Sequence, residues 1–174
     1  MNIPKYLIVH HTGGTNSNPL ADTSHHTFEI VNAYHRQNPN INLGHPSSLG
    51  YYIGYHYFIE KSGRTIQGRA DNDEGAHTKG KNDESIGICL AGNFDLTLPA
   101  KEQIDSLLKL LERLSALYKI PINNIVPHRK FSSKTCYGLN LSNDWAADLV
   151  REKYRSILDV LRAKVAELLK KFFR

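Results

Sequence analysis

The sequence has only two cysteines, and it lacks any apolar run long enough to cross a membrane. Two cysteines, Cys89 and Cys136, are too few for a disulfide framework. A transmembrane helix needs about 18 or more consecutive apolar residues, and no run approaches that length. The start, MNIPKYLIVHHTGG, has one lysine and no small-residue cleavage site. We therefore expect a first strand there and synthesis in the cytoplasm without a signal peptide.

The first 150 residues have no net positive charge. The net charge is +5, and residues 151–174 contain eight lysines or arginines against three acids. Residues 1–150 are therefore neutral. A nucleic-acid-binding domain carries basic residues across its binding face, so we expect no nucleic-acid partner.

The composition that is present is typical of one globular domain. The chain has 174 residues, of which 40% are hydrophobic and 22% charged. We predict an α/β fold: a single domain with a central mixed β-sheet flanked by helices and a C-terminal amphipathic helix. The pattern predicts strands over 5–11 and 86–92, and a hairpin over 55–69 with its turn at Ser62 and Gly63. It predicts three helices: one from a Ser24 cap to about Gln37, one over 100–119, and one from about Asn143 to the end.

The two cysteines lie in different settings. Cys89 belongs to the apolar run SIGICLAG, which predicts a buried structural thiol. Cys136 belongs to the polar stretch PHRKFSSKTCYG, where a disulfide, a packing residue and a metal ligand are the alternatives. A bond between the two would join a strand interior to a polar loop in a reducing compartment, which is rare.

Three residues in loops or at strand ends are potential zinc ligands: His10, His128 and Cys136. Zinc binds histidine nitrogen and cysteine thiolate, and three protein ligands plus a water form its catalytic arrangement. Spacing alone is weak support, because a single histidine after an apolar strand is more often a hydrogen-bonded core residue. From the residues alone, both interpretations remain open.

Four motifs occur in one order across residues 5–138: IVHHTGG, GYHYFIEKSGRTIQGR, GAHTKGKNDESIGICLAGNF and PHRKFSSKTC. With these motifs the chain resembles the zinc-dependent N-acetylmuramoyl-L-alanine amidases of the phage lysozyme type, which are related to animal peptidoglycan recognition proteins. The resemblance implies a catalytic domain over residues 1–143, with residues 144–174 as an extension.

The resemblance also implies roles for individual residues. It makes one zinc ion the cofactor, peptidoglycan the partner, and hydrolysis of the bond between N-acetylmuramic acid and L-alanine the reaction. The ligands implied are His10, His128 and Cys136; the catalytic residues are Tyr55 and Lys134; the residues lining the substrate groove are His56, His77 and Thr78.

Two positions depart from the family pattern or compete with it. Relatives commonly have proline after the cysteine, where this chain has Tyr137, so the rigidity of that loop is in question. His11 follows the implied ligand, but side chains alternate along a strand, so His10 and His11 should point to opposite faces.

Four functions are compatible with the resemblance. A phage endolysin made inside the host and acting on its cell wall fits the absence of a signal peptide. A non-catalytic peptidoglycan-binding protein would usually lack one of the ligands, and all three are present here. A cytoplasmic muropeptide-recycling amidase would have aspartate in place of Cys136. Nothing in the sequence favours or excludes the fourth, a regulatory contact with a polymerase.

The C-terminal segment 150–174 has apolar residues at helical spacing, with the excess positive charge on its other faces. One interpretation is a helix packed on the domain or on a partner copy. The other is a helix that contacts an anionic membrane surface, which the neutral composition of residues 1–150 and the terminal KKFFR favour.

Overall fold

A five-stranded mixed sheet forms the centre of the computed structural model, which describes residues 3–15, 17–38 and 45–172. Its strand order is β3-β2-β4-β1-β5. The central pairs β1–β4, β1–β5 and β2–β4 are parallel, and β2–β3 is the antiparallel hairpin that the sequence predicts. The strands are β1 (Tyr6–His11), β2 (Tyr57–Ile59), β3 (Thr65–Gln67), β4 (Ser85–Leu90) and β5 (Ile125–Pro127).

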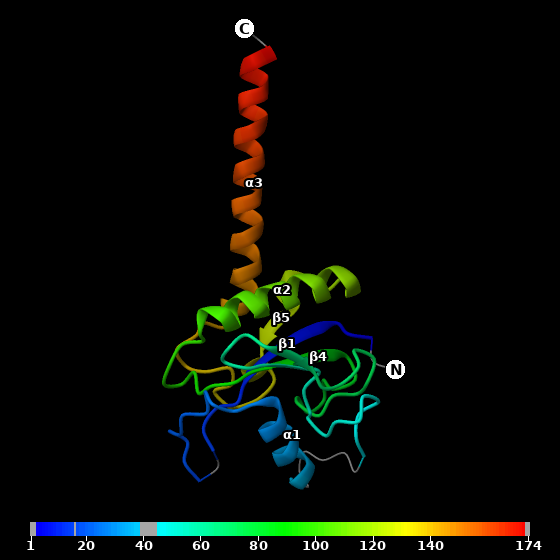
Figure 1. Ribbon diagram of the computed structural model, residues 1–174. Helices are drawn as coiled ribbons and strands as arrows, with labels where there is room; N and C mark the ends of the chain where they lie inside the picture. Colours follow the sequence, from blue (N-terminus) through cyan, green and yellow to red (C-terminus); the bar gives the residue numbers. More distant parts are fainter. Residues whose placement is uncertain (1–2, 16, 39–44, 173–174) are drawn as a thin grey trace.

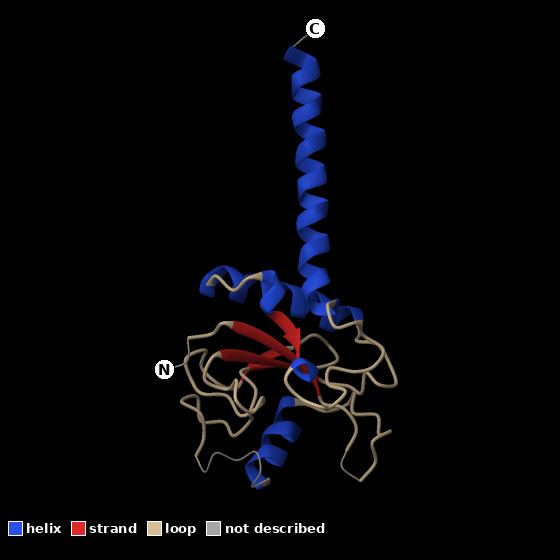
Figure 2. Ribbon diagram, turned by 180° about the vertical axis from the view of Figure 1, so that it is seen from behind, coloured by secondary structure: helices blue, strands red, loops and turns tan. Residues whose placement is uncertain are grey.

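Helices cover both faces of this sheet. α1 (Phe28–Gln37) lies on one face, and α2 (Lys101–Tyr118) with the first turns of α3 (Trp145–Phe172) lies on the other (Figures 1 and 2). Two short 3₁₀ helices, η1 (Ile122–Asn124) and η2 (His128–Lys130), flank β5. The predicted α/β class with a mixed sheet between helices is confirmed.

Alternation along β1 separates the main core from the opposite face. Leu7 and Val9 belong to the large apolar cluster on the α2 side. His10 pairs in register with Cys89, which belongs to the smaller cluster on the α1 side. The strand therefore presents His10 towards the α1 face at the carboxyl end of β1. Cys89 is fully buried, as predicted, and both cysteines are free.

Two elements differ from their sequence predictions. α1 is capped by Thr27, whose side chain accepts a hydrogen bond from the Ile30 amide, and not by Ser24. Ser24 instead bonds to Asp22 through its amide and hydroxyl, which holds it in the preceding turn. β5 is missing from the sequence prediction because three residues are too few to show a period.

α3 extends far beyond the globular part of the molecule (Figure 1). Ala146, Ala147 and Val150 are buried in the main core, whereas the side chains of residues 152–169 are exposed. The interpretation in which this helix packs along the domain is therefore wrong beyond its first turns. None of the described helices is both long and apolar enough to cross a membrane.

Candidate metal centre

The three implied ligands converge at the carboxyl ends of neighbouring strands. His10 is the last residue but one of β1, His128 follows β5 directly, and Cys136 lies in the loop after η2. Because β1 and β5 are adjacent and parallel, their carboxyl ends meet at one edge of the sheet. One ligand atom from each residue lies within 4.8 Å of the other two.

The spacing and the donor set of this group fit a zinc ion. His10 Nδ1 lies 3.7 Å from Cys136 Sγ. A tetrahedral zinc with ordinary bond lengths to nitrogen and sulfur separates such a pair by about 3.6 Å. The rings of His10 and His128 are 4.6 Å apart between centroids. Two imidazoles and one thiol could thus bind a single ion with a fourth coordination position left over.

The histidines of the group are neutral at physiological pH. Burial lowers the pKa of His10 well below its ordinary value, and nearby histidines lower it further. Burial, followed by the charge of Lys134, lowers the pKa of His128 to about 4. Both rings therefore keep a lone pair available for a cation. Burial raises the pKa of Cys136 to about 12, so its thiolate needs a cation beside it.

Arg129 holds the loop that carries Cys136. Its guanidinium donates to the carbonyl oxygens of Gly138 and Leu141, both at 2.6 Å, and its backbone amide donates to the Cys136 carbonyl at 2.7 Å. From the other side, Asp95 accepts from the Thr135 hydroxyl and from the amide of residue 139, both at 2.8 Å. The sequence gives no sign of these roles, because Arg129 and Asp95 each occur there as an ordinary charged residue of a loop.

Tyr137 also stabilises this loop, although the family commonly has proline there. Its side chain is fully buried against the ring of Trp145, with centroids 5.5 Å apart. Its hydroxyl donates to the carbonyl oxygens of Ser142 and Asn143. The bulky residue ties the loop to the start of α3, so the departure from the family pattern does not leave the loop unsupported.

A cavity of about 800 Å³ opens beside the three ligands. Tyr55 and Lys134 both line it, as do His77 and residues of α1. The ring of Tyr55 lies 5.1 Å from that of His10 between centroids. Burial raises the pKa of the Tyr55 hydroxyl well above its ordinary value, so the hydroxyl stays protonated and can donate a hydrogen bond. Lys134 is exposed at the rim, near enough for its charge to act on His10 and His128.

Two of the three predicted groove residues are below the cavity surface. His56 is fully buried: its Nδ1 accepts from the Gly87 amide, and its Nε2 bonds to the Asp73 carbonyl. Thr78 is 1% exposed, and its hydroxyl faces the rings of His77 and His10. Neither side chain is among those lining the cavity, so their placement does not support the predicted contact with substrate.

His77 contacts the outer nitrogen of His10. His77 Nδ1 lies 3.1 Å from His10 Nε2, whereas the other ring nitrogen, Nδ1, faces Cys136. A cation bound at His10 Nδ1 would leave the proton on Nε2, which could then donate to His77. The His77 ring fits here because Gly87 has no side chain: an added Cβ would lie 2.5 Å from the ring.

His11 points away from the group, as alternation predicts. Its Nδ1 accepts from the Phe94 amide at 3.0 Å on the other side of the strand. Burial lowers the pKa of His11 to about 4. His11 is therefore a hydrogen-bonded neutral side chain next to the three ligands.

The chain is similar to known proteins in both sequence and fold. The family described as N-acetylmuramoyl-L-alanine amidase matches residues 1–139. Peptidoglycan-recognition protein SC2 of Drosophila melanogaster is 32% identical over 145 residues, which cover 82% of this chain and 73% of that protein. The endolysin of Escherichia phage T7 is 35% identical over 100 residues, 53% of this chain and 64% of that one. The solved structure of N-acetylmuramoyl-L-alanine amidase LysC from Clostridium intestinale URNW superposes with a TM-score of 0.65 at 26% identity, covering 88% of this chain and 87% of that one.

Proposed function

Because this chain belongs to the N-acetylmuramoyl-L-alanine amidase family, we propose that it is a zinc-dependent peptidoglycan amidase. Its reaction is hydrolysis of the amide bond between N-acetylmuramic acid and the L-alanine of the stem peptide. The observation that carries the proposal is the convergence of His10, His128 and Cys136 beside an open cavity. The similarity to phage endolysins supports the same activity.

The chain's own residues have separate tasks in this reaction. When bound, zinc supplies a Lewis acid that lowers the pKa of water towards about 7 and polarises the amide carbonyl. Tyr55, protonated and beside His10, donates a hydrogen bond to an oxygen at the reacting centre. Lys134, at the rim, offers a cation to the oxyanion that forms on attack.

We place this activity in host-cell lysis, with the bacterial cell wall as the target. A purely peptidoglycan-binding function is less well supported, because all three ligands are present together with Tyr55 and Lys134. The boundary between residues 1–143 and 144–174 stays a prediction. The contact of residues 150–174 with an anionic membrane surface is a separate proposal that concerns α3 and not the metal centre.

Purified cell-wall sacculi provide the direct test. Digestion should release peptides with new free L-alanine amino termini, identified by mass analysis, and the protein should contain about one zinc per chain. Cys136→Ser should lose both zinc and lysis while the fold persists. Cys89→Ser should instead lower the stability and keep the zinc, because Cys89 belongs to the buried apolar cluster and is not one of the three ligands.

A matched pair of lysine variants tests the proposed role of Lys134. Lys134→Gln should reduce the rate of wall lysis by about 100-fold or more while zinc binding persists, as expected for loss of an oxyanion partner. Lys130→Gln, also exposed and four residues earlier, should be as active as the parent. Equal activity of the two variants, or products cut at another bond, would contradict the proposal.

A further inference from the structure

Beyond the globular part, α3 exposes a continuous apolar surface, here called the α3 stripe. Its seven side chains are between 43% and 57% exposed. At 100° per residue they fall on one side of the helix. The stripe consists of Tyr154, Ile157, Leu158, Leu161, Val165, Leu168 and Leu169. A helix that packs on its own domain does not leave such a surface in water, so the stripe indicates a partner.

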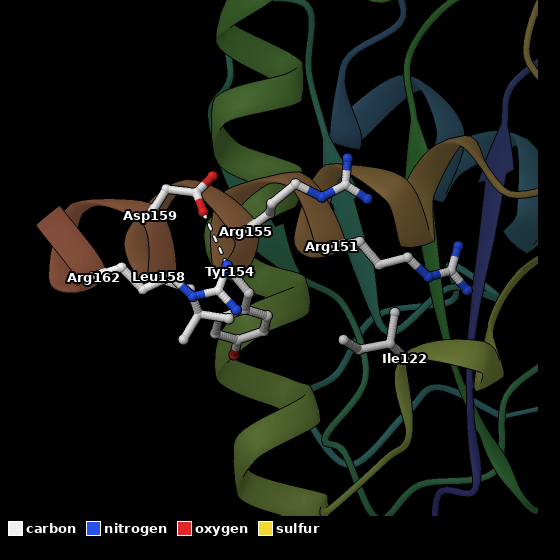
Figure 3. Close-up of a pocket in the computed structure, with 7 residues that line it drawn as sticks. All are labelled: Ile122, Arg151, Tyr154, Arg155, Leu158, Asp159 and Arg162. Atoms are coloured by element: carbon white, nitrogen blue, oxygen red, sulfur yellow. Dashed lines mark hydrogen bonds and ion pairs between the residues drawn. The ribbon is translucent and has the colours of Figure 1, made fainter.

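Figure 3 shows where the stripe begins, at the corner between α3 and η1. Tyr154 and Leu158 line a hollow of about 510 Å³ together with Ile122. Just before it, Arg151 bonds to Asp148 and Asn123, and Lys153 forms an ion pair with Glu112 of α2 at 2.7 Å. These contacts fix the base of the helix on the globular part. The rest of the stripe therefore lies on a helix that is already formed and attached to the globular part.

Charges are sorted around the stripe by sign. Arg155 and Arg162 follow one edge of it, and Lys164 lies on the other. The acids of this segment lie outside the stripe: Glu152, Asp159 and Glu167. Asp159 forms an ion pair with Arg162 at 3.4 Å, and both side chains are exposed. An apolar surface bordered by cations on both sides matches a surface that is apolar inside and anionic at its edge.

A second copy of the chain fits this pattern poorly. Tyr154, Leu158, Leu161, Val165 and Leu168 follow the alternating four- and three-residue spacing of a coiled-coil seam. In paired helices the positions beside the seam carry charges of opposite sign. Here the charged residues at those positions are Arg155, Arg162 and Lys164. Neither orientation of two paired copies would give these cations an acidic partner across the seam. Parallel helices would set Arg162 opposite Ile157 and Lys164 opposite Leu169 of the other copy, and antiparallel helices would bring arginines together.

We propose that the α3 stripe binds in the plane of an anionic phospholipid membrane. The apolar side chains enter the boundary between headgroups and acyl chains, and Arg155, Arg162 and Lys164 extend along their edges to the lipid phosphates. This partner goes beyond the proposed amidase activity and requires neither zinc nor the cavity. It would hold the enzyme at the membrane that adjoins its wall substrate.

The test uses the full-length chain and vesicles that contain either phosphatidylglycerol with phosphatidylcholine or phosphatidylcholine alone. Sedimentation should recover the protein with the anionic vesicles, and added salt should weaken the binding. Leu161→Glu, in the stripe, should weaken the partition by at least about tenfold, which corresponds to about 1.4 kcal/mol. Val160→Glu adds the same charge at an equally exposed neighbour off the stripe and should change the partition much less.

Each other outcome contradicts the proposal. Equal partition of the two variants, or equal binding to neutral vesicles, would exclude the stripe or the charge pattern as the cause. A stable dimer in ultracentrifugation that Leu161→Glu dissociates, without lipid binding, would make a second copy the partner. Cys136→Ser should bind the vesicles like the parent, so loss of the amidase and loss of the lipid contact are distinguished.

Discussion

At the scale of single residues, the proposed zinc centre depends on groups that orient the ligands as much as on the ligands themselves. His10 has two ring nitrogens, and only Nδ1 faces Cys136. His77 contacts the other nitrogen, and Arg129 fixes the backbone around Cys136. The affinity for zinc should therefore respond to substitutions that remove no ligand.

His77→Phe tests this dependence, given the proposed zinc site. The variant keeps a ring beside Gly87 but removes the acceptor for the His10 Nε2–H, so zinc affinity should fall by about 10- to 100-fold. Competition with a chelator measures the affinity without reference to activity. His26→Phe is the control, because His26 also lines the cavity but lies outside the ligand group. Unchanged affinity in His77→Phe would show that His77 does not orient the ligand.

His35 should make folding sensitive to mild acid. Its Nδ1 accepts from the Gly54 amide at 2.8 Å, and burial lowers its pKa from 6.5 to about 4. The unfolded chain therefore binds more protons between these two values, so this stabilisation is complete above pH 6.5 and is lost as the pH falls towards 4. At pH 5 the loss should be about 2 kcal/mol relative to pH 7.

Urea unfolding at the two pH values measures this loss. His35→Asn cannot titrate in this range, so its stability should change by about 2 kcal/mol less than that of the parent between pH 7 and pH 5. The same change in both proteins would assign the acid sensitivity to other groups.

At the scale of elements, α2 depends on one buried polar residue in its first turn. Gln103 is 1% exposed, and its amide donates to the Ala91 carbonyl at 2.9 Å and reaches the Ile59 carbonyl at 3.3 Å. Its side-chain oxygen accepts from the Ala100 amide at the start of the helix. One side chain thus connects α2 with the ends of β2 and β4.

Gln103→Ala should lower the free energy of unfolding by about 1–3 kcal/mol, because it leaves buried backbone groups without a partner. The neighbouring exposed variant Glu102→Ala should change it by less than about 0.5 kcal/mol. Urea denaturation gives both values. A loss no greater in Gln103→Ala than in Glu102→Ala would contradict the proposed connection.

At the scale of the whole molecule, α3 begins in the protein core and continues into solvent. Its first turns complete the main core through Ala146, Ala147 and Val150, and the side chains of residues 152–169 are exposed to water. The last contact of this helix with α2 is the ion pair of Lys153 with Glu112, so the helix leaves the globular part after Lys153.

Substitutions of two valines on this helix test where the core ends. Val150→Ala should lower the free energy of unfolding by about 1–3 kcal/mol, because Val150 is fully buried. Val160→Ala, at a side chain that is 56% exposed, should change it by less than about 0.5 kcal/mol. Thermal or urea unfolding distinguishes them. Similar losses in both would mean that α3 packs along its whole length.

Short-range patterns in the sequence predict most of the helices and strands, and the resemblance to a family implies the ligands. The apolar run before His10 predicts a buried strand, and alternation separates His10 from His11, because both features depend only on neighbouring residues. The resemblance, carried by short motifs in order, supplied Tyr55, Lys134 and the three ligands. Local patterns missed β5, which has only three residues, and misplaced the cap of α1.

Which residues come into contact depends on the folded chain and not on local sequence. Arg129, Asp95 and Tyr137 support Cys136 through contacts made when the loop folds back, and no spacing in the sequence encodes them. The burial of His56, at a position where a groove residue was predicted, likewise depends on neighbours from distant segments. The direction of α3 was decided in the same way, because an amphipathic pattern gives a helix its apolar side but does not determine what covers it.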